Sequence, residues 1–201
     1  MRINSKIQIV GNKVILVPYK KLHVEKYHQW MLSPLLQELT ASESLTLEEE
    51  YKMQQSWLND SDKCTFIVLD KSLMMDKESE IEAMIGDTNL FLVDQEDRSL
   101  AEGEIMIAEP GYRGQKRGWE AMLLMFRYGL ETLGITRYQV KIGLSNTPSI
   151  NMFKKMHFLE VGRSEVFQEV TLEVKVSENW KVWLLENTRC YDLLPCDHDN
   201  I

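Results

Sequence analysis

One stretch of this sequence is apolar around nearly its whole circumference when it is read as a helix. It runs from about Gly118 to Leu133 and carries few charges. An ordinary surface helix keeps a polar face toward water, so a helix without such a face has to be buried on more than one side. This helix should therefore lie inside the fold with other elements packed around it.

Strand and helix patterns alternate along the rest of the chain. β-Branched and apolar runs predict strands, and Thr46 with Glu49 has the spacing of a capping box ahead of one helix. This order predicts an α/β (α+β) domain in which helices flank a mixed sheet. A charged stretch, 75–82, is expected to be an exposed loop. The predicted strands are 13–19, 65–69, 83–93, 101–107, 137–142, 159–170 and 172–176, and the predicted helices are 21–31, 47–58, 118–133, 148–156 and 177–187.

The chain is long enough to bury one core. Its 201 residues are 44% hydrophobic, which suits a single domain at the upper end of the ordinary size range. No internal repeat, low-complexity tract or linker divides it. We expect one domain over residues 1–186, followed by a polar C-terminal tail, 187–201, that is mobile.

The charge balance limits the classes of partner. The formal net charge is −8 at pH 7, whereas nucleic acid or an anionic lipid surface would require clustered Lys and Arg. We therefore expect no nucleic-acid partner and no membrane partner. An amine-bearing partner suits this acidic chain better.

Cysteine usage and the apolar runs bear on location. Three cysteines are an odd number in a chain of this size, which favours a reducing compartment. No run approaches the length that spans a bilayer, and the first residues lack the apolar core of a signal peptide. We expect a cytoplasmic protein, with the nucleus as the alternative. The cysteines and histidines match no ordinary zinc spacing, so no metal is expected.

The most specific motif lies between a predicted strand and the apolar helix, and it reads PGYRGQKRGW over residues 110–119. A glycine-bearing loop that opens a helix offers unpaired backbone N–H groups and the positive end of the helix dipole, which suit a pyrophosphate. A tight connection that merely needs glycine is the other interpretation, and glycine spacing alone favours it.

With its surroundings, this loop resembles the acetyl-CoA loop of the GNAT acetyltransferases, which reads Arg or Gln, two residues, Gly, any residue, Gly or Ala. Arg113 and Gly118 match the outer positions, and Lys116 stands where the inner glycine belongs. A second block, 146–158, resembles the family's second conserved helix, which packs against the cofactor. Further segments resemble the eukaryotic N-acetyltransferase-9-like branch, and the similarity covers nearly all of 14–176. These segments are 39–43, 65–70, 86–92, 106–110 and 166–172.

The resemblance implies the GNAT fold, with a mixed, mostly antiparallel central sheet, and acetyl-CoA as the co-substrate. It also implies that a backbone N–H near 106–108 stabilises the oxyanion of the reaction. The positions that it assigns to acetyl-CoA are Met106, Ile107, Ala108, Arg113, Gly114, Gln115, Lys116, Arg117, Gly118, Trp119, Asn146, Ser149 and Phe153.

Acetyl transfer from a thioester also needs a neutral amine and a proton for the departing thiolate. Glu102 and Glu104 share one face of a predicted strand because side chains alternate, and the family often places its basic glutamate on this strand. Glu104 is the first candidate for the base and Glu102 the second, with a solvated face as the alternative for Glu102. Many relatives use a tyrosine as the acid where this chain has Phe153, which cannot donate. Ser149 matches a serine that serves this role in some ribosomal-protein acetyltransferases.

Asp87 and Asn89 also fall on one face of a predicted central strand, where polar residues are unfavourable without a purpose. Binding of the substrate amine and structural hydrogen bonding are equally consistent with their position. We carry both residues as candidates for substrate binding.

These features predict an acetyl-CoA-dependent N-acetyltransferase that acts on a protein or peptide amino group. An α-amino group with a pKa of ~7.8 is about one tenth neutral at neutral pH, whereas less than about one thousandth of lysine side chains, at ~10.4, are neutral. A modest base therefore suffices for an α-amino group. Two alternatives stay open. The chain could be a non-catalytic GNAT-fold interaction protein, since Lys116 and Phe153 depart from the usual pattern, or an acetyltransferase for a small amine such as a polyamine.

Overall fold

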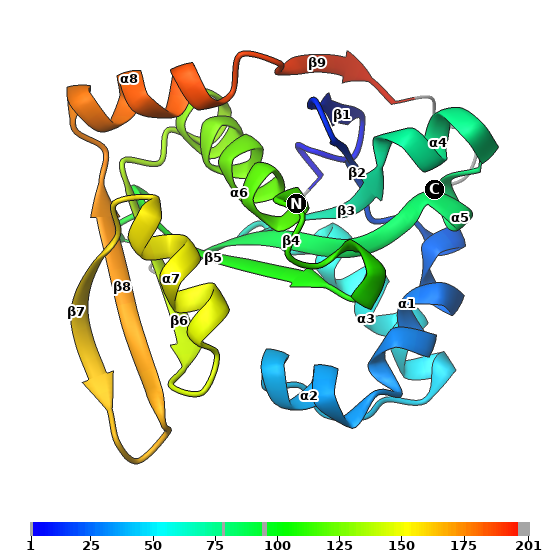
Figure 1. The fold of residues 1–201 in the computed structure, drawn as a ribbon. Helices are drawn as coiled ribbons and strands as arrows, with labels where there is room; N and C mark the ends of the chain where they lie inside the picture. Colours follow the sequence, from blue (N-terminus) through cyan, green and yellow to red (C-terminus); the bar gives the residue numbers. More distant parts are fainter. Residues whose placement is uncertain (1, 78, 94–95, 197–201) are drawn as a thin grey trace.

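The computed structural model of the protein describes residues 2–77, 79–93 and 96–196, and a single sheet runs through it (Figure 1). Within these residues the sheet has nine strands in the order β7-β8-β6-β5-β4-β3-β2-β1-β9. Neighbours pair antiparallel except β5 and β6, which are parallel. The predicted mixed, mostly antiparallel sheet is confirmed. The strands are β1 (Ile7–Val10), β2 (Val14–Pro18), β3 (Lys63–Asp70), β4 (Met84–Leu92), β5 (Leu100–Ile107), β6 (Arg137–Gly143), β7 (Leu159–Ser164), β8 (Glu169–Lys175) and β9 (Asp192–Pro195).

Helices cover both faces of this sheet, and each face encloses a hydrophobic core of its own (Figure 1). One core lies between the sheet and α6, α7 and α8. The other lies between the sheet and α1 and α3. The helices are the 3-10 turn η1 (Lys21–His23), α1 (Val24–Met31), α2 (Pro34–Thr40), α3 (Leu47–Asn59), α4 (Lys71–Lys77), α5 (Glu80–Ala83), the 3-10 turn η2 (Pro110–Tyr112), α6 (Arg117–Tyr128), the π-helical turn η3 (Gly129–Leu133), α7 (Thr147–Lys155) and α8 (Glu178–Asn187).

The apolar helix predicted from the sequence is α6 together with η3, and it is buried as expected. It lies directly on β5, where Gly103 leaves room for it: a Cβ on Gly103 would come within 3.0 Å of Met122 Cε and 3.1 Å of Phe126 Cε1. The position of α6 therefore fixes the position of β5. The buried side chains of α6 are Ala121, Met122, Leu123, Leu124, Met125, Phe126 and Tyr128.

The predicted capping box opens α3. Thr46 Oγ1 accepts a hydrogen bond from the backbone N–H of Glu49 (3.3 Å), and the Glu49 carboxylate accepts one from the N–H of Thr46 (2.8 Å). These bonds pair two backbone donors that the start of a helix leaves without partners. They fix the start of a helix that covers the second core.

Several short elements differ from the sequence-based expectations. The charged stretch 75–82 is not a loop, because α4 reaches into it and α5 begins within it. Local caps explain both helices: Asp70 Oδ1 accepts from Leu73 N (3.0 Å), and Ser79 caps α5 through Glu82 N (3.4 Å). The predicted strand 159–170 is divided by a turn between β7 and β8, in which Gln168 has a φ of 52°.

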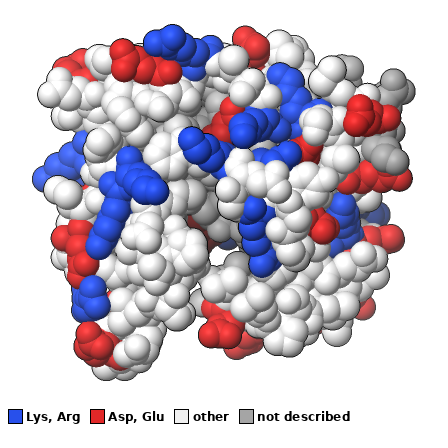
Figure 2. Space-filling model, viewed as in Figure 1, with Lys and Arg blue, Asp and Glu red and all other residues white. Residues whose placement is uncertain are grey.

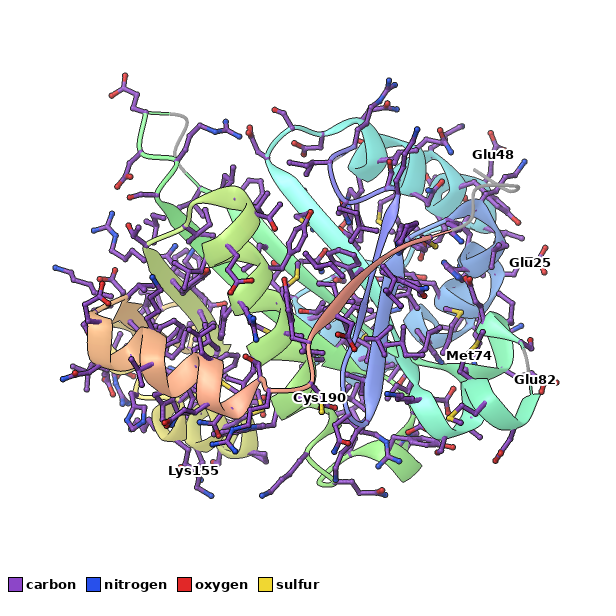
Figure 3. All side chains as sticks on the ribbon, turned by 90° about the horizontal axis from the view of Figure 1, so that it is seen from above. Glu25, Glu48, Met74, Glu82, Lys155 and Cys190 are labelled. Atoms are coloured by element: carbon purple, nitrogen blue, oxygen red, sulfur yellow. The ribbon has the colours of Figure 1, made fainter. Side chains whose placement is uncertain are left out.

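The C-terminal segment also differs from the expected mobile tail. Asp192–Pro195 forms β9, which pairs antiparallel with β1 at the edge of the sheet. The N–H of Cys196 then donates to Lys6 O (3.0 Å). Seen from above, β9 lies along β1, and Cys190 lies at the turn that leads into it (Figure 3). Residues 197–201 are outside the described part of the chain, so the expectation for them stays a prediction.

We expect Gly86 to be essential for the pairing of β4 with β5. A Cβ at Gly86 would lie 1.9 Å from the backbone oxygen of Met106, which cannot move without breaking the ladder. Gly86→Ala should lower the free energy of unfolding by at least about 3 kcal/mol, the upper range for overpacking. Urea unfolding would measure it, with Gly143→Ala as the matched control, since a Cβ there meets nothing within 4 Å. Equal stability of the two variants would contradict this account of β4 and β5.

Candidate active site

The sheet opens between its two parallel strands. β5 and β6 are paired only from Leu100–Arg137 to Glu102–Gln139, although β5 stays paired with β4 as far as Ile107. The later residues of β5 therefore have no strand partner on the β6 side. Figure 2 shows this side of the molecule hollowed between α7 and α2, with Lys and Arg side chains grouped above the hollow.

Backbone groups of β5 face this opening. The Ala108 N–H donates a hydrogen bond to Ile85 O (2.8 Å). This bond determines which residues of β5 direct their backbone groups toward β4. Hydrogen-bonded pairs alternate in an antiparallel ladder, so the backbone groups of Met106 also face β4, whereas those of Ile105 and Ile107 face away from it. The side chain of Arg113 agrees with this arrangement, because its Nε donates to Ile107 O (2.7 Å).

The expected oxyanion donor can now be placed more narrowly. The sequence pointed to a backbone N–H near 106–108, but the N–H groups of Met106 and Ala108 are used in pairing with β4. Their side chains are also buried. Neither residue offers a free backbone N–H to the oxyanion, and their contact with the cofactor stays a prediction. Ile107 keeps an N–H on the β6 side of the strand.

The loop from Pro110 to Lys116 leads from this opening into α6. Gly114 (φ 70°) and Lys116 (φ 66°) both adopt the left-handed conformation. Lys116 is the N-cap of α6, and no side chain caps the helix. The N–H groups of the first helical turn, Arg117 to Trp119, have no intrahelical partner and carry the positive end of the helix dipole. They are the groups to which the motif predicts that an anion binds.

The basic side chains of the loop have different tasks. Arg113 Nη2 donates to Ala108 O (2.8 Å), in addition to its bond to Ile107, so its guanidinium holds the end of β5. Arg117 pairs with the buried carboxylate of Asp70 and lies over the Tyr112 ring. Lys116 is exposed. Of the three cationic residues predicted to contact the cofactor, Arg113 and Arg117 thus shape the loop, and Lys116 extends from it.

Gly118 and Trp119 hold the first turn of α6 against its neighbours. A Cβ on Gly118 would lie 3.3 Å from Ile107 Cγ1, so glycine permits the close approach of the helix to β5. Trp119 packs edge-on against Trp183 of α8, with 6.2 Å between the ring centroids. Gln115 bridges the loop, accepting from Arg117 and donating to Gly111 O.

The start of α7 lies on the other side of the opening. Asn146 caps the helix, because its Oδ1 accepts from Ser149 N (3.2 Å). Ser149 keeps a partly exposed side chain. Phe153 does not meet the expectation of a cofactor contact: it is 2% exposed and packs between Phe126 and Phe158 in the core. Burial of this ring explains why the family's tyrosine can be replaced by phenylalanine here.

The four predicted polar residues of the two central strands do share one side of the sheet. Asn89 lies directly opposite Glu104, and Glu102 lies two residues further along β5 on the same face. Asp87 lies opposite Met106. We call this surface, formed by Asp87, Asn89, Glu102 and Glu104, the acidic face. It is the face covered in part by α1 and α3.

The two glutamates of the acidic face are in contact with cations. Lys63 Nζ lies 3.7 Å from Glu104 Oε2 and 3.8 Å from the centroid of the Trp57 ring. Glu102 Oε2 accepts from Lys141 (2.9 Å) and from Gln139 (3.1 Å). Glu104 is 49% exposed, compared with 14% for Glu102. Of the two, Glu104 is the one that an incoming amine can reach.

Asp87 differs from both glutamates. It is 4% exposed, and its Oδ2 accepts from Asn89 Nδ2 (2.9 Å), whose own Oδ1 accepts from the Thr65 hydroxyl. Within the described residues, Asp87 Oδ1 is buried and has no hydrogen-bond partner. Burial and the nearby Glu104 carboxylate raise the pKa of Asp87 to about 7, although Lys63 and the Asn89 hydrogen bond oppose the shift. The carboxyl group therefore titrates near neutral pH.

Aromatic side chains that sequence reasoning treated only as packing enclose the buried end of the acidic face. The ring centroids of Tyr19 and Tyr27 are 5.2 Å apart, and Trp57 lies 6.0 Å from Tyr19. Trp30 donates through Nε1 to Glu109 (2.8 Å), which ties α1 to the loop after β5. The helical spacing of Tyr27 and Trp30 was the available signal. It could not show that β4 places a carboxylate beneath them.

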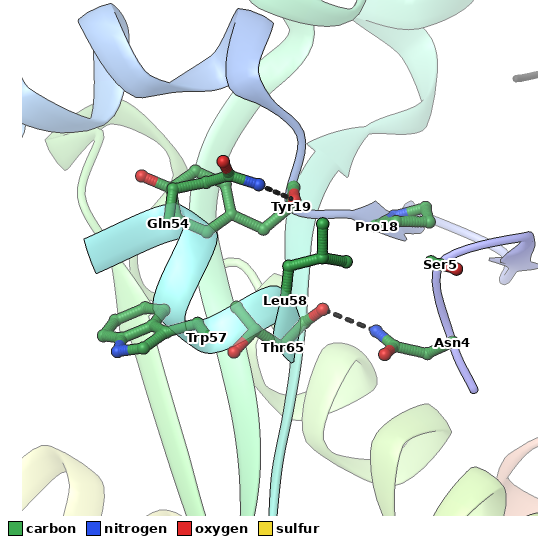
Figure 4. Close-up of a pocket in the computed structure, with 8 residues that line it drawn as sticks. All are labelled: Asn4, Ser5, Pro18, Tyr19, Gln54, Trp57, Leu58 and Thr65. Atoms are coloured by element: carbon green, nitrogen blue, oxygen red, sulfur yellow. Dashed lines mark hydrogen bonds between the residues drawn. The ribbon is translucent and has the colours of Figure 1, made fainter. Parts of the chain in front are cut away.

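A small cavity lies beside these aromatic residues, and a larger one lies elsewhere in the molecule. One, of about 20 Å³, is lined by Asn4, Tyr19, Gln54, Trp57 and Thr65 among others, and it has room for a single water (Figure 4). It is too small for an acceptor. The second, of about 570 Å³, lies among β7, β8 and α8, and no predicted site residue lines it.

Comparison with known proteins decides the family. The family described as the acetyltransferase (GNAT) domain matches residues 13–159. The chain belongs to this GNAT family. Its relatives make it an N-acetyltransferase: a human protein named alpha/beta-tubulin-N-acetyltransferase 9 is 56% identical over 191 residues, covering 94% of this chain and 92% of the human protein.

Solved GNAT structures show the same fold. The Vibrio cholerae spermidine N-acetyltransferase in complex with CoA and spermine superposes with a TM-score of 0.66 at 14% identity, covering 86% of this chain and 96% of that one. The ribosomal L7/L12 alpha-N-protein acetyltransferase RimL gives a TM-score of 0.68 at 17% identity, covering 85% and 95%. In the described part of this GNAT chain, no group of His, Cys, Asp or Glu could hold a metal ion. No described helix is long and apolar enough to cross a membrane.

Lys116 occupies a backbone conformation that glycine adopts more readily. Lys116→Gly should raise the free energy of unfolding by about 0.5–1 kcal/mol, because the left-handed conformation costs other residues about 1–2 kcal/mol and glycine loses part of that gain to entropy. Chemical denaturation would measure it. Lys116→Ala is the matched control, since it removes the ammonium and keeps the strained φ. A stabilisation of similar size in both variants would show that charge, and not backbone strain, is responsible.

Proposed function

We propose that this GNAT protein transfers the acetyl group of acetyl-CoA to the α-amino group of a protein. One observation carries the proposal: Ile107 keeps an N–H at the opening between β5 and β6. The uncapped start of α6 lies beside this N–H, and Glu104 lies on the acidic face of the same strand. These are the parts that acetyl transfer to an amine requires, an oxyanion donor, a phosphate site and a carboxylate near the acceptor.

The residues present fit acetyl-CoA. The N–H groups of Arg117, Gly118 and Trp119 would hold its pyrophosphate, with Lys116 as an added cation. Ile107 N–H would stabilise the negative charge that develops on the thioester oxygen. Bound there, acetyl-CoA supplies an activated acyl group with a good leaving group. Ser149 stays the candidate acid for the departing thiolate.

The acidic face suits a cationic acceptor. Glu104 is half exposed and would attract an ammonium group, which has to lose a proton before it can attack the thioester. An α-amino group needs less help than a lysine side chain, because its pKa of ~7.8 lies about 2.6 units lower. A chain terminus therefore fits this site better than a lysine side chain.

The names of relatives suggest which protein carries the acceptor. The human relative is named for alpha- and beta-tubulin, and we propose tubulin as the acceptor of this chain as well, in the cytoplasm. A polyamine is the second candidate, because the Vibrio cholerae spermidine N-acetyltransferase has the same fold. An acidic face can bind either kind of amine.

Mass spectrometry of acetylated products would separate these acceptors. The protein and acetyl-CoA are incubated with peptides that begin with the first residues of α- and β-tubulin and contain an internal lysine, with the same peptides blocked at the N-terminus, and with spermidine. We expect acetylation at the free N-terminus and none on the blocked peptides. Modification of lysine alone, or of spermidine alone, would contradict the proposed acceptor.

The acetyl-CoA site is tested separately by calorimetry. Gly118→Glu places a carboxylate between α6 and Ile107 and should weaken acetyl-CoA binding by more than about 100-fold, which corresponds to about 2.7 kcal/mol. Gly111→Glu adds the same charge to the same loop at a position where a Cβ meets nothing within 4 Å, and it should change the affinity by less than about tenfold. Equal binding by both folded variants would refute this site.

A further inference from the structure

We propose that Asp87 receives the proton of the acceptor ammonium, with Asn89 and Thr65 as the residues that position it and Glu104 as the residue that binds the amine. This inference rests on the proposed function. It reverses the order given by the sequence, in which Glu104 was the first candidate for the base and Asp87 was only a candidate for substrate binding.

The hydrogen-bond network fixes Asp87 in one orientation. The Thr65 hydroxyl donates to Asn89 Oδ1, which leaves Asn89 Nδ2 to donate to Asp87 Oδ2 (2.9 Å). Asp87 Oδ1 is then held without a partner in a buried position. An unpartnered buried carboxylate oxygen costs free energy unless a ligand completes it. The fixed network therefore leaves one acceptor atom of Asp87 available to take up a proton.

Glu104 and Asp87 have different roles because their surroundings differ. Glu104 is half exposed and lies 3.7 Å from Lys63, so its carboxylate is within reach of an incoming ammonium group. Asp87 is buried, and its pKa of about 7 suits a group that takes up and releases a proton at neutral pH.

Charged and titratable groups face Asp87 from each packed element. Glu104 of β5 and Lys63 of β3 act on its charge in opposite directions. Burial raises the pKa of Tyr27 on α1 and of Tyr19 after β2, and the charge of Asp87 adds to both shifts. Glu50 of α3 faces the same two tyrosines. Both tyrosines stay neutral near pH 7, so neither changes charge where Asp87 does.

The proton balance of the step is simple. The acceptor ammonium binds at Glu104 and passes one proton to Asp87 Oδ1, which leaves a neutral amine and a neutral carboxylic acid. The amine nitrogen forms a bond to the acetyl carbon, and the bond from that carbon to sulfur breaks. The second proton of the nitrogen goes to the thiolate, giving the thiol of coenzyme A. Asp87 then releases its proton to solvent.

The test begins with the ligand-free protein, so that it does not depend on turnover. Carbon-13 NMR of protein labelled at the aspartate carboxyl carbons would follow Asp87, identified as the signal absent from Asp87→Asn. We expect a midpoint near pH 7. Glu104→Gln removes a neighbouring negative charge and should move the midpoint to lower pH. Lys63→Met removes a positive charge and should move it to higher pH.

Glu102→Gln is the matched control for these variants. It makes the same chemical change on the same strand, but Glu102 is held by Lys141 and Gln139 and is not among the groups that shift Asp87. The midpoint of Asp87 should therefore not move in this variant. A shift as large as that of Glu104→Gln would contradict the assignment.

Acetyl transfer is then followed against pH with an N-terminal peptide. The acceptor amine has its own pKa of ~7.8, so the informative result is how far the rising limb of the rate–pH profile moves in each variant. The limb should move to lower pH in Glu104→Gln and to higher pH in Lys63→Met, by the same amounts as the NMR midpoints. Asp87→Asn keeps the size of the side chain and should lower kcat about 10²–10⁴-fold, the usual contribution of a general base.

The possible failures are distinguishable. An Asp87 midpoint near 4, or a pH limb that stays in place in both neighbour variants, overturns the role of Asp87 while leaving acetyl transfer intact. Transfer by the wild-type protein to no peptide and no polyamine overturns the proposed function, and this inference falls with it. Full activity of Asp87→Asn would return the role of base to Glu104.

Discussion

The rest of the structure depends on the point at which the parallel pairing between β5 and β6 ends. β5 is paired with β4 along its length but with β6 over only three residues. Backbone polar groups are rarely left without partners inside a protein. On the exposed edge of β5, Arg113 satisfies the Ile107 carbonyl, and the Ile107 N–H faces away from β4. The same interruption thus ends the strand pairing and creates the site.

Close contact between α6 and β5 keeps this edge in place. Gly103 and Gly118 each occupy a position where a side chain would push the helix away from the strand. Since α6 is buried along most of its length, the helix and strand move as one unit. The first turn of α6 and the end of β5 are therefore held against each other by the hydrophobic core.

Much of this arrangement could be predicted from local sequence patterns. The apolar helix, the capping box at Thr46, and the shared faces of Glu102 with Glu104 and of Asp87 with Asn89 follow from local patterns, which depend on residues close in the chain. Depth could not be predicted in the same way. Asp87 is buried because Tyr27 and its neighbours pack over β4 from distant segments, and Phe153 is buried because Phe126 lies beneath it. The alternation of side chains along a strand shows on which face of the sheet a side chain lies, but it does not show which elements cover that face.

The pairing of β9 with β1 has a consequence for how the protein is made. Residues 7–10 contact residues 192–195, so the sheet joins segments separated by most of the chain. Contacts of such high sequence separation slow folding, because a long loop has to close before they form. During synthesis β1 emerges first and waits for nearly the whole chain before this neighbour is available. Its outer edge stays unpaired during that time, which exposes the nascent chain to aggregation.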